Sequence, residues 1–138
     1  MQSDTKTAPV SKKIHWAGRI ISALPVLFLL MDGVMKLFKP AVVVETTVKL
    51  GYQDAVIVPL GIVLLTCTVL YAIPRTSVLG AILLTGYLGG AVATHVRVGE
   101  GLFPIFLPFI FGVLIWGGLF LRDTRLRALL PLRKGEET

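Results

Sequence analysis

AVIVPLGIVLLTCTVLYAIPRTSVLGAILLTGYLGGAVATHV, residues 55–96, contains two apolar runs, 55–73 and 77–96, separated by the short turn Pro-Arg-Thr. Each run is close to the ~20 residues that a helix needs to cross a ~30 Å hydrocarbon layer at a rise of ~1.5 Å per residue. Two further apolar runs, 14–37 and 102–121, lie on either side of this pair. The sequence therefore predicts an all-α membrane protein with four transmembrane helices.

The composition agrees with one membrane domain, over residues 14–121. Apolar residues make up 54% of the 138-residue chain, and the mean hydropathy is +0.80. Such a chain has no room for a soluble domain of ordinary size besides its four helices. We expect a polar N-terminal segment, 1–13, and a basic C-terminal tail, 122–138, outside the membrane domain. The first run, 14–37, is too long for the core of a signal peptide and is predicted to remain as a helix.

Basic residues gather on one side of the predicted bundle. Four spans place both termini on the same side, and that side carries ten of the fourteen lysines and arginines. These ten are Lys6, Lys12, Lys13, Arg19, Arg75, Arg122, Arg125, Arg127, Arg133 and Lys134. Because basic loops stay on the cytoplasmic side, we predict a multi-pass protein of the bacterial inner membrane with both termini in the cytoplasm. This topology and attraction to anionic lipid headgroups explain the net charge of +6, so we expect no nucleic-acid partner.

The lengths of the connections predict how the helices are arranged. The connections at 74–76 and 97–101 are short. Short connections make the helices that they join antiparallel neighbours, as in an up-down-up-down four-helix bundle. We therefore expect this bundle, with one longer excursion between its first and second helices.

That excursion contains AVVVETTVKLGYQD, residues 41–54, immediately after Pro40. In a helical conformation Ala41, Val44 and Val48 would share one face. This spacing predicts a short amphipathic helix that lies on the outer surface of the membrane. The many β-branched residues leave an extended segment as the alternative.

Small residues are frequent on the third and fourth predicted helices. They are Gly86, Gly90 and Ala93 on the third, and Gly112, Gly117 and Gly118 on the fourth. Lipid gives helices no hydrophobic reason to associate, so small residues often mark a close approach of two backbones. We predict that these residues pack within the bundle, with a homodimer face as the alternative.

The side chains argue against several kinds of redox centre. Cys67 is the only cysteine, so the chain has no internal disulfide and no two-thiol redox pair. His15 and His95 fall near opposite membrane faces, too far apart to ligate one haem iron. No spacing typical of a metal site is present. We therefore predict no metal site, no catalytic residues and no catalytic activity of the chain on its own.

Ionisable residues inside the apolar runs concentrate at the end remote from the termini. Asp32 lies about eighteen residues into the first run and His95 about eighteen into the third, so both reach the outer boundary. The two can meet if the first and third helices pack together. Lys36 follows Asp32 by one turn, and Tyr87 precedes His95 by two four-residue steps. The candidate ligand-binding cluster comprises Asp32, Lys36, Glu45, Tyr87, His95 and Arg97.

This cluster has two interpretations. Ionisable groups inside a membrane are costly, so they usually face the bundle interior and serve a function. Near the boundary, however, long side chains reach water and opposite charges pair, which makes structural ion pairing the alternative. In a ligand site His95 can carry a proton, and Arg97 can hold a carboxylate or polarise a carbonyl. A quinone headgroup suits such groups, since its two carbonyl oxygens need donors and its reduction needs protons.

Four stretches of the sequence resemble one family of small bacterial membrane proteins. They are IPRTSVLGAILLTGYLGGAVATHVRVG at 73–99, MDGVMKLFKP at 31–40, LGYQ at 50–53 and the W-x-x-x-x-L-R-D element at 116–123. In these stretches the chain resembles the DoxX-like family over nearly its whole length. The resemblance implies a four-helix membrane bundle. Relatives named DoxX or DoxD are connected with thiosulfate:quinone oxidoreduction and with oxidative-stress complexes, which implies a redox partner subunit here.

Three functions from different classes are consistent with these features. The first is a membrane subunit that docks a redox partner protein and binds a quinone at the polar cluster. The second is a binding or carrier protein for a small amphipathic solute. The third is a structural protein that organises the lipid bilayer or neighbouring membrane proteins and has no ligand. We take the redox-associated subunit as the leading hypothesis.

Overall fold

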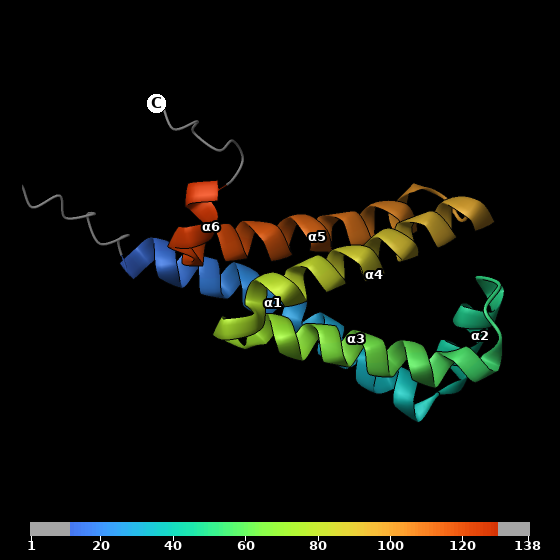
Figure 1. The fold of residues 1–138 in the computed structure, drawn as a ribbon. Helices are drawn as coiled ribbons and strands as arrows, with labels where there is room; N and C mark the ends of the chain where they lie inside the picture. Colours follow the sequence, from blue (N-terminus) through green and yellow to red (C-terminus); the bar gives the residue numbers. More distant parts are fainter. Residues whose placement is uncertain (1–11, 130–138) are drawn as a thin grey trace, which may run out of the picture.

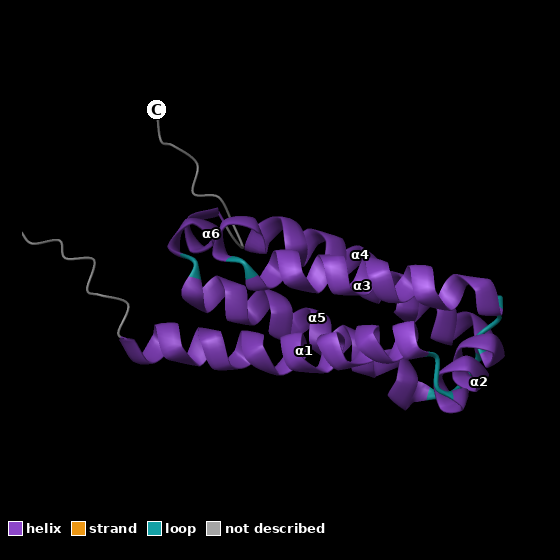
Figure 2. Cartoon of the chain, turned by 90° about the horizontal axis from the view of Figure 1, so that it is seen from below, coloured by secondary structure: helices purple, strands orange, loops and turns teal. Residues whose placement is uncertain are grey.

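The computed structural model describes residues 12–129. This range consists of helices joined by short loops and contains no strand (Figure 2). These helices are α1 (Lys12–Phe38), α2 (Ala41–Lys49), α3 (Ile57–Ala72), α4 (Ser77–Val98), α5 (Leu102–Arg122) and α6 (Thr124–Leu129). The 3-10 turns η1 (Asp54–Val56) and η2 (Pro74–Thr76) precede α3 and α4. Most of the predicted polar segment 1–13 and about half of the predicted basic tail 122–138 lie outside the described residues.

Four helical segments are long and apolar enough to cross a membrane, which confirms the predicted number of spans. They are Lys12–Phe38, Asp54–Ala72, Pro74–Val98 and Leu102–Arg122. Their helices α1, α3, α4 and α5 form the predicted antiparallel bundle (Figure 1). The start of α1, the turn η2 and α6 lie at one end, called the termini end below, and α2 lies at the other, the α2 end.

Each helix of the bundle packs mainly against two others. α1 contacts α3 and α5, and α4 contacts the same two helices, so α1 and α4 lie diagonally across the bundle. The condition under which Asp32 and His95 were expected to meet, direct packing of the first and third spans, is therefore not fulfilled. The reason is topological, because short connections make α3, α4 and α5 successive neighbours and leave α1 the place between α3 and α5.

The termini end is closely packed. Gly80 of α4 lies so near α3 that a Cβ atom there would overlap the backbone of Tyr71. Gly118 of α5 lies equally near α1, where a Cβ would overlap the hydroxyl of Ser22. Tyr71 is fully buried, and its hydroxyl hydrogen-bonds to the carbonyl oxygen of Ile115 (2.7 Å) and to Ser22 Oγ (2.9 Å). These contacts join all four spanning helices at this end.

Towards the α2 end, α4 and α5 separate from α1 and α3 (Figure 1). α1 and α3 stay together there because glycines lie at their contact. A Cβ atom at Gly61 of α3 would be 2.9 Å from the carbonyl oxygen of Gly33 in α1. The bundle is therefore closed at the termini end and opens between these two pairs of helices at the α2 end.

Most of the small residues predicted to pack within the bundle do not do so. A Cβ atom at Gly86, Gly90, Gly112 or Gly117 would have nothing within 4 Å outside its own helical turns. The prediction is wrong for these four glycines and for Ala93, which is exposed, and it is confirmed for Gly118. Gly86 and Gly90 lie where the bundle opens, and Gly112 and Gly117 border an apolar groove between α4 and α5.

The segment after Pro40 is helical, as predicted, so the extended alternative is wrong. α2 lies at the end of the bundle (Figures 1 and 2). Its buried residue is Thr47, whereas Ala41 and Val48, predicted to share one face, are exposed. At a membrane surface a helix turns such an exposed apolar face towards lipid.

Candidate functional site

The opening of the bundle leaves a cavity of about 470 Å³, called the α2-end cavity below. α1, α4 and α5 form most of its walls, and α2 with the residues after it covers one end. Its polar lining residues are Asp32, Lys36, Thr46, Thr47, Tyr52, Tyr87, Thr94 and His95. Pockets for small organic molecules commonly measure about 300–1,000 Å³, so this cavity has the right size for one.

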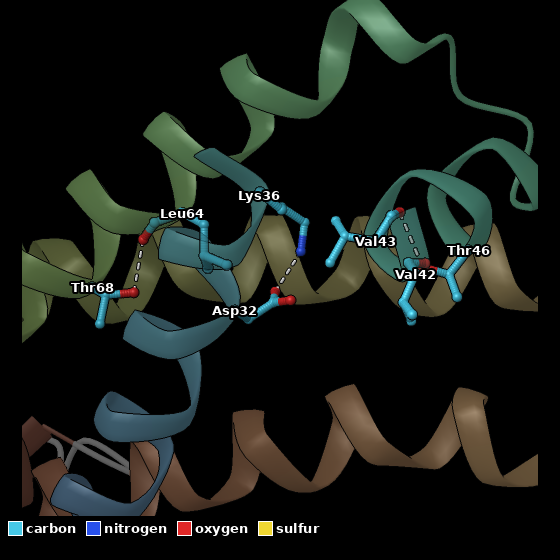
Figure 3. Close-up of polar contacts among 7 residues, drawn as sticks. All are labelled: Asp32, Lys36, Val42, Val43, Thr46, Leu64 and Thr68. Atoms are coloured by element: carbon cyan, nitrogen blue, oxygen red, sulfur yellow. Dashed lines mark hydrogen bonds and ion pairs between the residues drawn. The ribbon is translucent and has the colours of Figure 1, made fainter. Parts of the chain in front are cut away.

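Asp32 and Lys36 form an ion pair on α1, one helical turn apart. Lys36 Nζ lies 2.5 Å from Asp32 Oδ2 (Figure 3). The Lys36 side chain is 14% exposed and that of Asp32 is 35% exposed. Pairing offsets part of the cost of holding both charges in apolar surroundings. No residue in 12–129 hydrogen-bonds to the other carboxylate oxygen of Asp32, which leaves this oxygen able to accept from a ligand.

Three side chains of α4 reach the cavity from one face of the helix. Tyr87 and Thr94 are seven residues apart, which places them two turns from each other on the same side. The Thr94 hydroxyl donates to the carbonyl oxygen of Gly90 (2.8 Å), so it accepts the hydrogen bond from the Tyr52 hydroxyl (2.8 Å). The hydroxyl of Tyr87 has no hydrogen-bond partner within the described part of the chain. Tyr87 is therefore the phenol that can bond to a ligand.

His95, the third of these side chains, is oriented by a carboxylate. Its Nδ1 atom lies 2.9 Å from Oε2 of Glu100. Because a carboxylate accepts hydrogen bonds, this contact favours the proton on Nδ1 and leaves Nε2 for another partner. Nε2 accepts a hydrogen bond when the ring is neutral and donates one when the ring is protonated. The pair can therefore take up or release a proton beside the cavity.

Two aromatic rings form an apolar wall of the same cavity. Phe28 of α1 and Phe111 of α5 are stacked, with ring centroids 4.6 Å apart and ring planes 23° from parallel. Offset-stacked rings are a favourable arrangement for aromatic pairs. A planar ligand ring could extend this stack on the cavity side.

The cover of the cavity is fastened to the bundle by two polar contacts. Arg97 at the end of α4 donates from Nη2 to the carbonyl oxygen of Leu50 (2.9 Å), just after α2. Lys39 and Asp54, on either side of α2, form an ion pair of 2.7 Å. Thr46 of α2 has its hydroxyl turned back to its own helix, 2.9 Å from a backbone carbonyl oxygen (Figure 3). α2 is thus held over the cavity from both of its ends.

The model of the DoxX-like family matches residues 20–118, which is well over half of the chain. The chain belongs to the DoxX-like family. The match begins in α1 and ends in α5, so it includes all four spans of this DoxX-like protein. No curated protein and no solved structure gives a significant match. Family and fold together make the DoxX-like protein a multi-pass membrane protein whose helices contact the lipid bilayer.

The predicted cluster of the DoxX-like protein is only partly brought together. Four of its six members, Asp32, Lys36, Tyr87 and His95, line the α2-end cavity. Arg97 binds the backbone of the cover instead, and Glu45 is exposed on α2 and lies outside the lining. Asp32 and His95 therefore share one cavity without their helices packing on each other.

Other cavity residues of the DoxX-like protein were not predicted from the sequence. Thr94 lies seven residues after Tyr87, so a search for residues on the face of Tyr87 would have found it. Glu100, which orients His95, follows it by five residues across the end of α4. Tyr52 had no such signal, because its contact with Thr94 depends on how the loop after α2 folds back over the bundle.

The polar groups of the cavity favour hydrogen bonding and proton exchange. Between Lys12 and Leu129, no three His, Cys, Asp or Glu side chains come together as a metal site requires. Cys67 is buried in α3 and lies outside the lining of the α2-end cavity. The DoxX-like protein thus offers a ligand one ammonium, one carboxylate, one imidazole and one free phenol.

Proposed function

We propose that this DoxX-like protein binds a small amphipathic molecule in the α2-end cavity. One observation carries the proposal, the gathering of the Asp32–Lys36 ion pair, the imidazole of His95 and the phenol of Tyr87 around a cavity among membrane-spanning helices. Ionisable groups in spans are costly, and they usually mark a path or site for an ion or a ligand. A bound ligand would account for the presence of all these polar groups around one cavity.

Structural ion pairing accounts for only part of this arrangement. It explains Asp32 with Lys36, and it explains His95 with Glu100. It does not explain Tyr87, whose hydroxyl has no partner among the described residues. Tyr87 lines the cavity, where an oxygen atom of a bound ligand can accept the hydrogen bond of this hydroxyl. Tyr87 therefore favours a ligand over pairing alone.

A quinone is the ligand class that suits these groups best. Its two carbonyl oxygens accept hydrogen bonds, which the Tyr87 hydroxyl and the Lys36 ammonium can donate. Its planar ring can stack beside Phe28 and Phe111. Its apolar tail also finds room, since the groove between α4 and α5, of about 610 Å³, shares lining residues with the cavity at Leu88 and Pro108.

A redox role would require a second protein. Reduction of a quinone to a quinol takes up two electrons and two protons, and His95 is placed to deliver a proton. We infer that the electrons come from a redox partner protein, in keeping with the resemblance to DoxX and DoxD relatives. We expect the purified chain, given thiosulfate as electron donor, to leave bound quinone oxidised. Quinol formation by the purified chain alone would contradict the need for a partner.

The carrier hypothesis has less support than binding. A carrier must open its site towards the opposite side of the membrane. In this protein the termini end is closed by Gly118 against Ser22 and by the buried hydroxyl of Tyr71. Release of a ligand in that direction would require these contacts to break. We therefore favour exchange of the ligand with the membrane at the α2 end, beneath the cover formed by α2 and the residues after it.

The first test is mass spectrometry of the organic extract from protein purified in mild detergent, followed by titration with a short-chain quinone. We expect about one quinone per wild-type chain. Loss of one hydrogen bond in Tyr87→Phe should weaken quinone binding about tenfold. Thr66→Val is the control, because Thr66 on α3 lies outside both the cavity and the groove, and its hydroxyl donates to a carbonyl oxygen of its own helix (Ile62, 2.8 Å). Extracts with phospholipid alone, or equal affinity in both variants, would overturn the proposal.

We further propose that both termini face the cytoplasm of a bacterial inner membrane. Arg19, Arg75, Arg122 and Arg125 all lie at the termini end, and basic residues favour the cytoplasmic side. Phosphatase and fluorescent reporters fused to the C-terminus test this orientation. We expect fluorescence from the cytoplasm and no periplasmic phosphatase activity, and the reverse pattern would contradict the orientation.

A further inference from the structure

A second polar cavity lies at the termini end of the bundle. It has a volume of about 670 Å³ and is bounded by the start of α1, the turn η2, the end of α5 and α6. Its charged lining residues are His15, Arg19, Arg75, Arg122, Asp123 and Arg125, so we call it the arginine cavity. Four arginines against one aspartate leave an excess of three positive charges, even with His15 neutral.

These arginines are not neutralised by carboxylates of the described chain. Within residues 12–129 the ion pairs involve lysines and a histidine, and none involves an arginine. Asp123 is already engaged, because its Oδ1 accepts from the backbone N–H groups of Arg125 (2.9 Å) and Leu126 (3.3 Å) at the start of α6. Its carboxylate therefore caps a helix and forms no ion pair with a guanidinium of the described residues.

Arg122 is fixed in place while part of its guanidinium lacks a partner. The group lies over the ring of Tyr71, with Cζ 5.0 Å from the ring centroid. Tyr71 is itself fully buried and hydrogen-bonded, so the ring is a rigid support. Nε of Arg122 is buried and has no hydrogen-bond partner among residues 12–129. Buried donors without partners are rare, and each one suggests an acceptor that completes it.

The chemistry of the cavity favours a phosphate group. Guanidinium groups bind phosphate through paired N–H donors, which makes arginine the usual residue for this anion. The position of the cavity favours phosphate carried on a lipid, because it lies at the ends of the spans, where headgroups lie. Trp16, 60% exposed on the first turns of α1 near Arg19, is an anchor typical of this level. Val78, Leu119 and Leu126 form an apolar part of the same lining.

We infer that the arginine cavity is a binding site for the headgroup of an anionic phospholipid, such as phosphatidylglycerol. Basic pockets between spanning helices are suited to such headgroups. Arg75 and Arg122 approach the phosphate from η2 and α5, and Arg19 and Arg125 add donors from α1 and α6. The bound lipid bridges the start of α1, the turn η2, the end of α5 and α6. This site is independent of any ligand in the α2-end cavity.

Native mass spectrometry of the full-length protein, released from detergent containing phosphatidylglycerol or phosphatidylcholine, tests the inference. We expect retention of one phosphatidylglycerol and little phosphatidylcholine. Arg75→Gln and Arg125→Gln should each weaken phosphatidylglycerol binding about tenfold, since each loses a charge-assisted contact. Both arginines are exposed, so neither change disturbs the packed core. Arg97→Gln is the matched control, because it removes the same charge at the opposite end.

Four results would overturn the inference. Equal retention of the two lipids would remove the anion preference. An equal loss in Arg97→Gln would reduce the effect to net charge. Displacement of the lipid by millimolar inorganic phosphate would show that the arginines bind free phosphate and that the lipid is incidental. Arg122→Gln removes the guanidinium whose Nε is unpaired within the described residues. Its unfolding temperature is measured to show that the variant is folded. Undiminished lipid binding in the folded variant would also contradict the site.

Discussion

The two ends of the bundle contain similar residues and use them differently. At the termini end Gly80 and Gly118 bring helix backbones into contact, whereas at the α2 end Gly86 and Gly90 face open space on the same helix as Gly80. Glycine alone therefore does not create a close contact in this protein. What matters is the neighbour that its missing side chain admits, and that neighbour changes along α4 as the bundle opens.

The two ends also differ in how their charged side chains are paired. At the α2 end two lysines have carboxylate partners, in the pairs Lys36–Asp32 and Lys39–Asp54, while Arg97 donates to a backbone carbonyl oxygen. At the termini end the arginines of the arginine cavity lack such partners within the described residues. A paired site suits a neutral polar ligand, while an unpaired basic site suits an anion. The proposals for a quinone-like molecule and for a phospholipid headgroup follow this difference.

The largest effect is expected when a single methyl group is added at a tight helix contact of the termini end. In Gly80→Ala the new Cβ would overlap the backbone of Tyr71, which cannot rotate away as a side chain can. Overpacking of this kind costs about 3 kcal/mol, and the better helix propensity of alanine offsets at most about 1 kcal/mol of it. We expect a much lower unfolding temperature, measured for the protein in detergent by intrinsic fluorescence.

Gly89→Ala is the matched control for this prediction. Gly89 lies on the same helix, has no atom of another helix near its Cβ position and does not line the α2-end cavity. It should leave stability unchanged or raise it by up to about 1 kcal/mol. Equal destabilisation by both changes would mean that Gly80 is no closer to its neighbour than Gly89, and the contrast between the ends would be lost.

These glycines also show which parts of the fold the sequence could predict. The number of spans follows from the bilayer thickness, which demands about 20 apolar residues for each helix, and so it was predictable. The packed glycines were not, because Gly80 and Gly89 look alike in the sequence. Their environments depend on the rotation of α4 about its axis, which the turn η2 and the contact with Tyr71 determine together.

In the candidate site, contacts between residues close in the sequence were predictable, and contacts between distant residues were not. Asp32 with Lys36 is a contact within one helix, and Tyr87 with His95 is a spacing along one helix, so the sequence indicated both. The pairing of Tyr52 with Thr94 spans forty-two residues and required the folded chain. Arg97 was predicted to contact a ligand, but its partner is a backbone carbonyl oxygen beyond α2.

An effect of intermediate size is expected from changes in the Asp32–Lys36 ion pair. These changes separate the contribution of the pair to stability from its contribution to ligand binding. Asp32→Leu or Lys36→Met alone leaves one charge unpaired, and we expect a loss of about 1–2 kcal/mol, reduced from the fully buried case because Asp32 is 35% exposed. The double variant removes both charges and should recover wild-type stability. Unfolding temperature and quinone affinity are measured on all three variants.

Quinone affinity in the double variant distinguishes the two interpretations of the pair. If the pair contributes to the ligand site, the double variant is stable but binds quinone about tenfold more weakly, through loss of the Lys36 donor. Wild-type affinity in the stable double variant would leave Asp32 and Lys36 as a structural ion pair, and Tyr87 with His95 would remain as the only polar ligand groups.

The smallest expected effect comes from two changes that each remove one phenolic hydroxyl and keep the ring. Tyr71→Phe loses the hydrogen bonds to Ile115 and Ser22 in the closed end and should cost about 1 kcal/mol, with quinone affinity unchanged. Tyr52→Phe loses the contact with Thr94 that ties the cover to α4, so stability should fall by less than about 0.5 kcal/mol. Because the cover then opens more often, quinone should dissociate several-fold faster in Tyr52→Phe, as measured by stopped-flow exchange. Equal losses of stability in both variants, with quinone released at the wild-type rate, would contradict this prediction. The Tyr52 hydroxyl would then act only as a packing contact, and the two ends would not differ in function.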